Sequence, residues 1–115
     1  MLGRPPGRAT ASRLRHPVTN PEQLFAVGYA ACFHSALRVV ARQQKADVSD
    51  SAVGAKVELG SLEDGGFGLA VELEVTLPNV DHETAQKLTE AAHQVCPYSN
   101  ATRGNIEVTL TVTDD

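Results

Sequence analysis

The first sustained pattern of hydrophobic and polar positions along the chain is helical. Between Leu24 and Phe33 no residue is charged, and apolar side chains occupy every helical direction, which a helix with one solvent-facing side does not show. Asn20 is a good N-cap residue, and Pro21 suits the first helical position, where no amide hydrogen is needed. Polar residues at 43–47 close the segment. We therefore expect one long, buried helix at the centre of the fold.

Two segments after this helix alternate apolar and polar residues, as half-buried strands do. Apolar side chains occupy every second position over 53–59 and again over 67–77, and the loop Glu63–Gly66 between them ends in two glycines. The pattern predicts a β-hairpin that ends at Pro78, because proline cannot donate to a strand ladder. The same alternation predicts a last strand over 106–112.

A second helix is predicted between the hairpin and the last strand. Asp81 is its N-cap residue, and the apolar residues at 85, 88, 92 and 95 share one of its faces. The helix should stop at Cys96, because Pro97 disfavours the helical conformation of the residue before it, and we expect a turn at 98–100. The order helix, two strands, helix, strand predicts an α+β fold in which an antiparallel sheet packs around the long central helix.

The amino-terminal segment differs from the rest of the chain. Residues 1–18 are rich in Arg, Pro and Gly and show no sustained hydrophobic period, so we expect a flexible leader, with a targeting peptide as the alternative. Residues 19–115 contain no internal repeat and form a single domain. In a chain of 115 residues the core is small, so a helix that is apolar on all sides favours an oligomer.

Charge limits the classes of partner. The net charge is −4, and the arginines that precede Glu22 are followed by an acidic remainder without a basic patch, which argues against nucleic acid. His34 and Arg38 interrupt the apolar run, so it falls short of the roughly 18 residues that indicate a membrane span. There is no secretory signal pattern either, and we expect a cytoplasmic protein.

The candidate chemistry lies in two cysteines, Cys32 and Cys96. Their spacing leaves open a structural disulfide, a redox pair or two unrelated buried thiols. A reactive Cys32 would need a cation nearby, because burial in an apolar helix disfavours the thiolate. If the fold joins the pair, Cys32 could attack a peroxide and Cys96 could condense with the resulting sulfenic acid. His34, His82 and His93 match no zinc spacing with these cysteines.

Two motifs carry a resemblance to a known family. The segment 19–33, which includes Cys32, and the segment 95–105, which includes Cys96, resemble the organic hydroperoxide resistance (Ohr) proteins of the OsmC-like superfamily. The similarity extends from residue 19 to the end of the chain and includes the spacing of the cysteines. The resemblance implies an OsmC-like fold and a peroxidase for alkyl and fatty-acid hydroperoxides, with Cys32 as the peroxidatic and Cys96 as the resolving cysteine.

The same resemblance implies further features of the site. Glu22 matches the family's catalytic glutamate, and no cofactor is bound, since dihydrolipoamide on a lipoylated protein, more than thioredoxin, is the external reductant. An intertwined homodimer is expected. The family's amino-terminal strands carry an arginine that stabilises the thiolate, and the leader 1–18 does not match them, so these strands are expected to be absent. The replacement arginines that we consider are Arg15 first, then Arg13 and Arg103.

Two other hypotheses remain, and the first is motivated by this departure. The chain could be a truncated, catalytically impaired remnant with a binding or structural role, or a thiol redox sensor that reacts without turnover. The distance between Glu22 and Cys32 adds a constraint, because ten residues of helix span about 15 Å. Either the helix breaks near Gly28 or the glutamate beside each thiol comes from a neighbouring chain. We expect the second arrangement, a homodimer with composite sites.

Overall fold

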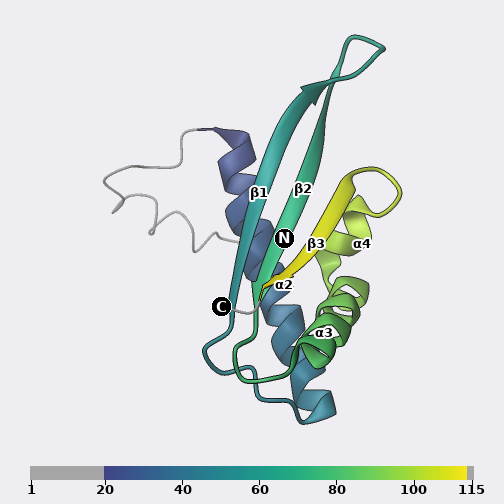
Figure 1. The fold of residues 1–115 in the computed structure, drawn as a ribbon. Helices are drawn as coiled ribbons and strands as arrows, with labels where there is room; N and C mark the ends of the chain where they lie inside the picture. Colours follow the sequence, from purple (N-terminus) through teal and green to yellow (C-terminus); the bar gives the residue numbers. More distant parts are fainter. Residues whose placement is uncertain (1–19, 114–115) are drawn as a thin grey trace, which may run out of the picture.

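The longest element is helix α2, Pro21–Gln44, which runs across one face of a small sheet (Figure 1). The computed structural model describes residues 20–113. Asn20 caps α2 as predicted, because its side-chain oxygen accepts a hydrogen bond of 2.8 Å from the Gln23 amide. The helix ends at Lys45, whose φ of 58° is left-handed. Between these ends it continues through Gly28, which excludes a helix break there, the arrangement that we did not expect.

Burial of α2 is less complete than the sequence pattern predicted. Tyr29, Phe33 and Leu37 are fully buried against the rest of the chain, whereas Leu24 and Val27 are 61% and 62% exposed. One small sheet covers one side of a helix, so full burial would require a second covering surface. By length and composition alone α2 could cross a bilayer, which differs from the expectation that its apolar run is too short. Core helices of soluble proteins meet the same criterion, and α2 packs its buried side against the rest of the chain.

The sheet is mixed and has the strand order β1-β2-β3. Strand β1, Ala52–Ser61, pairs antiparallel with β2, Phe67–Thr76, along their whole length, which confirms the predicted hairpin. Strand β3, Glu107–Thr113, pairs parallel with β2, so the prediction of a purely antiparallel sheet is wrong. The reason is the connection: a helical crossover brings the chain back to the end of the sheet at which β2 began.

That crossover consists of two helices. Helix α3, His82–Val95, begins after the predicted cap Asp81, whose side chain accepts a hydrogen bond from the Thr84 amide. The predicted turn at 98–100 is instead helical, in the short helix α4, Pro97–Thr102. Pro97 disfavours continuation of α3, and it suits the first position of α4, where no amide hydrogen is needed.

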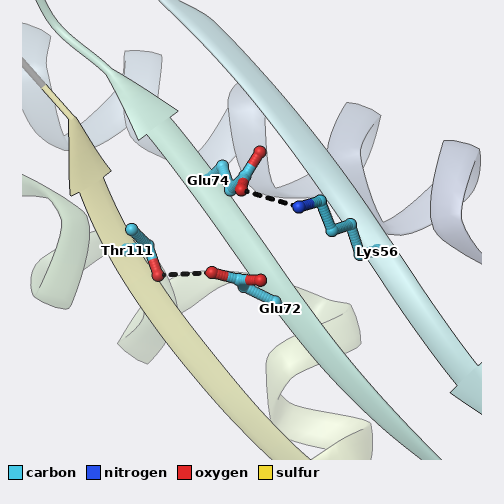
Figure 2. Close-up of polar contacts among 4 residues, drawn as sticks. All are labelled: Lys56, Glu72, Glu74 and Thr111. Carbon is cyan, nitrogen blue, oxygen red and sulfur yellow. Dashed lines mark hydrogen bonds and ion pairs between the residues drawn. The ribbon is translucent and has the colours of Figure 1, made fainter.

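The two faces of the sheet differ in polarity as the alternation predicted. The face toward the helices supplies Val71, Leu73 and Val75 to the core. Figure 2 shows the opposite face, where Lys56 Nζ lies 3.3 Å from Glu74 Oε2 and the Thr111 hydroxyl donates to Glu72 Oε2 at 2.7 Å. These polar groups belong to the solvated face of the sheet. Cys32 and Cys96 lie among the helices, on the opposite face.

Candidate active site

The two cysteines meet in space although 64 residues separate them. Their Sγ atoms are 3.6 Å apart, and both thiols are free. Cys32 lies in the middle of α2 and is partly buried, whereas Cys96 is completely buried. A disulfide bond is about 2.05 Å long, so the pair is in contact without being bonded. The fold therefore brings together the two residues that the sequence singled out.

Cys96 occupies the junction between α3 and α4. Its amide donates to the Ala92 carbonyl at 2.9 Å as the last bond of α3, and its carbonyl accepts from the Asn100 amide at 2.9 Å as the first bond of α4. The second helix stops at Cys96 as predicted, and Cys96 is in addition the N-cap residue of α4. Pro97 dictates this arrangement, since it terminates one helix and suits the first position of the next.

The environment of Cys32 disfavours its thiolate on balance. Burial raises the pKa of the Cys32 thiol above its ordinary value, and the hydrogen bond from the Tyr98 amide opposes that rise. The Cys96 thiol raises the pKa of Cys32 further, through the hydrogen bond between the two thiols and through repulsion between their charged forms. A thiolate at Cys32 thus receives one backbone hydrogen bond and needs additional positive charge to be abundant at neutral pH.

Aromatic rings lie one to two turns before Cys32 on α2. The Phe25 ring stacks on the Tyr98 ring at a centroid distance of 6.1 Å, and the Tyr29 ring is tilted against each of them at 5.7 Å. Gly28 permits this arrangement, because a β-carbon there would lie 3.2 Å from the Tyr98 hydroxyl oxygen. The three rings therefore form one aromatic cluster, and Tyr98 of this cluster also supplies the amide that hydrogen-bonds to the Cys32 sulfur.

A buried hydrogen-bond network lies beside these rings, and sequence reasoning missed it. The Tyr29 hydroxyl is 2.7 Å from Ser99 Oγ and 3.2 Å from Thr102 Oγ1, and Ser99 Oγ is 2.7 Å from His93 Nδ1. Tyr29 and Ser99 are fully buried. The sequence signal for this network was the pair of hydroxyl residues, Ser99 and Thr102, after Pro97, a pattern that is also typical of a turn.

Glu22 is not placed beside the thiols of its own chain. Glu22 lies in the first turn of α2, beside a hollow of about 390 Å³ that Ala55 and Val57 of β1 also line. The distance of about 15 Å expected along an unbroken helix between Glu22 and Cys32 therefore stands. Arg15 and Arg13 lie outside the described residues, as does the whole predicted leader 1–18.

Arg103 is engaged elsewhere. Its guanidinium donates a 2.7 Å hydrogen bond to the His93 carbonyl at the end of α3, and its positive charge adds to burial in lowering the pKa of His93. His34 is also structural in character, since its Nε2 atom lies 2.8 Å from Ser51 Oγ. Within residues 20–113 no group of three or more His, Cys, Asp or Glu side chains is placed to hold a metal ion.

Comparison with known proteins gives a consistent picture. The family model for OsmC-like proteins matches residues 15–111. The organic hydroperoxide resistance protein of Xanthomonas axonopodis pv. citri is 54% identical over 95 residues, which cover 82% of this chain and 66% of the relative. The chain thus spans slightly less than two thirds of that relative's length.

Solved structures agree with the sequence relatives. An organic hydroperoxide resistance protein from Elizabethkingia anophelis is 59% identical with a TM-score of 0.81, covering 84% of this chain and 69% of that one. The protein OhrB of Bacillus subtilis is 49% identical with a TM-score of 0.80, covering 94% and 78%. The family match, the sequence identities and the shared α+β architecture lead to one conclusion: this chain belongs to the OsmC-like family, and within that family it is similar to the organic hydroperoxide resistance proteins.

Proposed function

We propose that this protein is a thiol peroxidase that reduces organic hydroperoxides to alcohols and so takes part in hydroperoxide resistance. The observation that carries the proposal is the 3.6 Å contact between Cys32 and Cys96 in a chain whose relatives are named for resistance to organic hydroperoxides. The pair combines a partly exposed thiol with a buried one, which suits one sulfur that meets the substrate and another that resolves it.

The first step consumes the hydroperoxide at Cys32. The thiolate sulfur attacks the terminal oxygen of the hydroperoxide, so that an S–O bond forms as the O–O bond breaks. The leaving alkoxide takes a proton and departs as the alcohol, and Cys32 is oxidised to a sulfenic acid. The Tyr98 amide, which hydrogen-bonds to this sulfur, stabilises the thiolate before attack.

The second step joins the two cysteines. The Cys96 sulfur, as a thiolate, attacks the Cys32 sulfur, the S–S bond forms, and the hydroxyl of the sulfenic acid leaves as water after it gains a proton. The sulfurs must approach by roughly 1.5 Å from their present contact to reach the length of a disulfide bond. An external dithiol then reduces the disulfide by exchange and is itself oxidised to a disulfide. We propose dihydrolipoamide on a lipoylated protein as this dithiol, acting in the cytoplasm.

Substrate preference follows from the residues around the thiol. Tyr98, whose amide hydrogen-bonds to the Cys32 sulfur, stacks its partly exposed ring on Phe25, and Leu24 and Val27 expose apolar side chains on the same helix as Cys32. An apolar hydroperoxide such as an alkyl or fatty-acid peroxide gains by burying its chain against such groups, whereas hydrogen peroxide gains nothing.

The proposed oligomer is a homodimer with composite sites. Exposed apolar side chains on α2 and at the start of β2 support it, since Leu24 is 61%, Val27 62% and Phe67 71% exposed in the single chain. An unbroken α2 keeps Glu22 away from the thiol of its own chain, so the glutamate beside each Cys32 would be supplied by the partner copy. A monomer in sedimentation at micromolar concentration would contradict this assembly.

A thiolate at Cys32 needs positive charge, no described residue that acts on its pKa supplies it, and we propose Arg15 for this role. A guanidinium stays charged and can bridge a carboxylate and a thiolate, and Arg103 is already bound to the His93 carbonyl. Arg15→Ala should therefore slow the reaction of Cys32 with hydroperoxide without changing the fold. An unchanged rate would exclude Arg15 from this role.

A steady-state assay tests the proposed activity. The purified protein should consume cumene or linoleic hydroperoxide for many cycles with dihydrolipoamide, which would also exclude a redox sensor that reacts once. Cys32→Ser should lose the activity, and Cys96→Ser should keep the first step while its sulfenic acid accumulates. Full activity of Cys32→Ser would overturn the assignment.

A second candidate, a catalytically impaired relative with a binding or structural role, is favoured by the raised pKa of Cys32. Alkylation of Cys32 by iodoacetamide across pH separates the two. An apparent pKa at or above the ordinary value of about 8.5 for a free thiol supports impairment, and a value well below it supports the peroxidase.

A further inference from the structure

We propose that Ser99 is a positioning residue for the thiol pair, acting through a hydrogen-bond chain from Tyr29 to His93 that holds α4 against α2 and α3. The catalytic consequence rests on the proposed function, but the positioning itself does not require that activity. Nothing in the reaction described above uses these three side chains, although all of them lie within a few residues of a cysteine.

The chain of contacts joins three helices at one point. Tyr29 belongs to α2, His93 to the last turn of α3, and Ser99 to the middle of α4. Ser99 Oγ is 2.7 Å from both the Tyr29 hydroxyl and His93 Nδ1, so one hydroxyl ties all three elements together. Thr102 adds a second contact from α4, at 3.2 Å from the Tyr29 hydroxyl.

Burial makes these bonds consequential. Tyr29 and Ser99 are fully buried and Thr102 is 4% exposed, so water cannot replace a lost partner without a rearrangement. Burial and the nearby Arg103 lower the pKa of His93, which favours a neutral ring that accepts the Ser99 proton at Nδ1 while Ser99 accepts the Tyr29 proton. Every hydroxyl proton in this chain then has an acceptor, and a fully satisfied polar network favours one packing arrangement over others.

Helix α4 needs such a fixing point. It has six residues, too few for a helix to be stable by itself, yet α4 and its N-cap residue supply two groups that contact the Cys32 sulfur. One is the Tyr98 amide, which hydrogen-bonds to that sulfur, and the other is Cys96, whose Sγ lies 3.6 Å away. Ser99 directly follows Tyr98 and is three residues from Cys96, so it fixes the segment that presents both groups.

The test compares Ser99→Ala with a matched control, Thr89→Val. Thr89 is as buried as Ser99, but its hydroxyl donates to the Ala85 carbonyl within α3 and does not touch α4. Two properties are measured on folded protein without any peroxide: the pH profile of Cys32 alkylation by iodoacetamide, and the equilibrium between the dithiol and the disulfide in buffers of reduced and oxidised dithiothreitol.

In Ser99→Ala the alkylation profile should move to higher pH, because the Tyr98 amide is no longer held on the sulfur. The equilibrium constant for forming the Cys32–Cys96 disulfide from the dithiol should fall about ten-fold, the factor that matches the loss of one buried hydrogen bond. Thr89→Val should leave both properties as in the unmodified protein. If Ser99→Ala does not fold, Tyr29→Phe removes one hydroxyl of the same chain and should shift both properties in the same direction.

The outcomes separate this inference from the proposed function. An unchanged or lowered alkylation profile in folded Ser99→Ala, or in Tyr29→Phe in its place, overturns the positioning role, and so does an equal shift in Thr89→Val. If the unmodified protein forms no disulfide in any buffer, the disulfide step of the proposed function fails, while the alkylation profile still decides whether Ser99 positions α4.

Discussion

Replacing Gly28 by alanine measures how firmly Tyr98 is held over the centre of α2. The new β-carbon would lie 3.2 Å from the Tyr98 hydroxyl oxygen and 3.3 Å from a ring carbon, closer than an ordinary contact. Because Tyr98 is 39% exposed, its ring can give way by a few tenths of an ångström without disrupting the core. The substitution therefore sets a gain in helix propensity against a loss of aromatic packing.

Both effects have estimable sizes. Alanine in place of glycine inside a helix stabilises a protein by about 1 kcal/mol. The Tyr98 ring contacts the rings of both Phe25 and Tyr29, and each such pair contributes about 0.5–1.5 kcal/mol, part of which is lost when the ring moves. We expect Gly28→Ala to leave the free energy of unfolding nearly unchanged, and to add the full helix gain of about 1 kcal/mol when Tyr98 is already alanine.

A double-mutant cycle in urea tests this prediction. The unmodified protein, Gly28→Ala, Tyr98→Ala and the double variant are unfolded in parallel, and the coupling energy is taken from the four free energies. We expect a coupling of about 1 kcal/mol, which is well above the deviation of about 0.3–0.5 kcal/mol seen for independent sites. Equal stabilisation by Gly28→Ala in both backgrounds would show that Tyr98 does not press on α2.

Three further predictions concern stability. Leu88→Ala should cost about 2–5 kcal/mol in urea unfolding, because Leu88 is fully buried, whereas Leu59, 54% exposed, should tolerate alanine. Asn20→Ala should cost about 1 kcal/mol by removing the cap of α2. The pKa values of His34 and His93 are lowered in the fold, so the unfolded chain binds more protons, and thermal stability should fall as pH drops below about 6.5.

Each of these has a contradicting result. Equal costs at Leu88 and Leu59 would place the core elsewhere, and an Asn20→Ala protein as stable as the unmodified one would mean that the helix end is not held by its cap. For the histidines, His93→Gln should flatten the pH dependence. A pH profile that stays as steep in His93→Gln would assign the effect to other groups.

Local patterns were sufficient for most of the fold. The cap at Asn20, the alternation along the hairpin and the cap at Asp81 each depend on neighbouring residues, so α2, β1, β2 and α3 could be predicted from the sequence. The direction of β3 could not, because parallel pairing depends on where a long crossover returns the chain. Helix α4 was missed since hydroxyl residues after a proline also suit a turn.

The candidate site shows the same division. The motifs around Cys32 and Cys96 named the thiols, but their contact, like the bond between Tyr29 and Ser99, joins residues more than 60 positions apart. Periodicity also overestimated the burial of α2, because an apolar residue such as Val27 indicates a surface that needs cover without indicating whether the same chain provides it.

The contact between Cys32 and Cys96 also bears on the folding of the chain. A bond across their 64-residue separation would close a loop that includes all of β1, β2 and α3. In the chain-entropy model, closing a loop of this length removes unfolded conformations worth about 4 kcal/mol at 25 °C. The oxidised protein would then resist heat and denaturant more than the reduced one, because the bond restricts the unfolded chain. Because Cys96 follows Cys32 by more than half of the chain, the thiol pair can form only after β1, β2 and α3 have been synthesised.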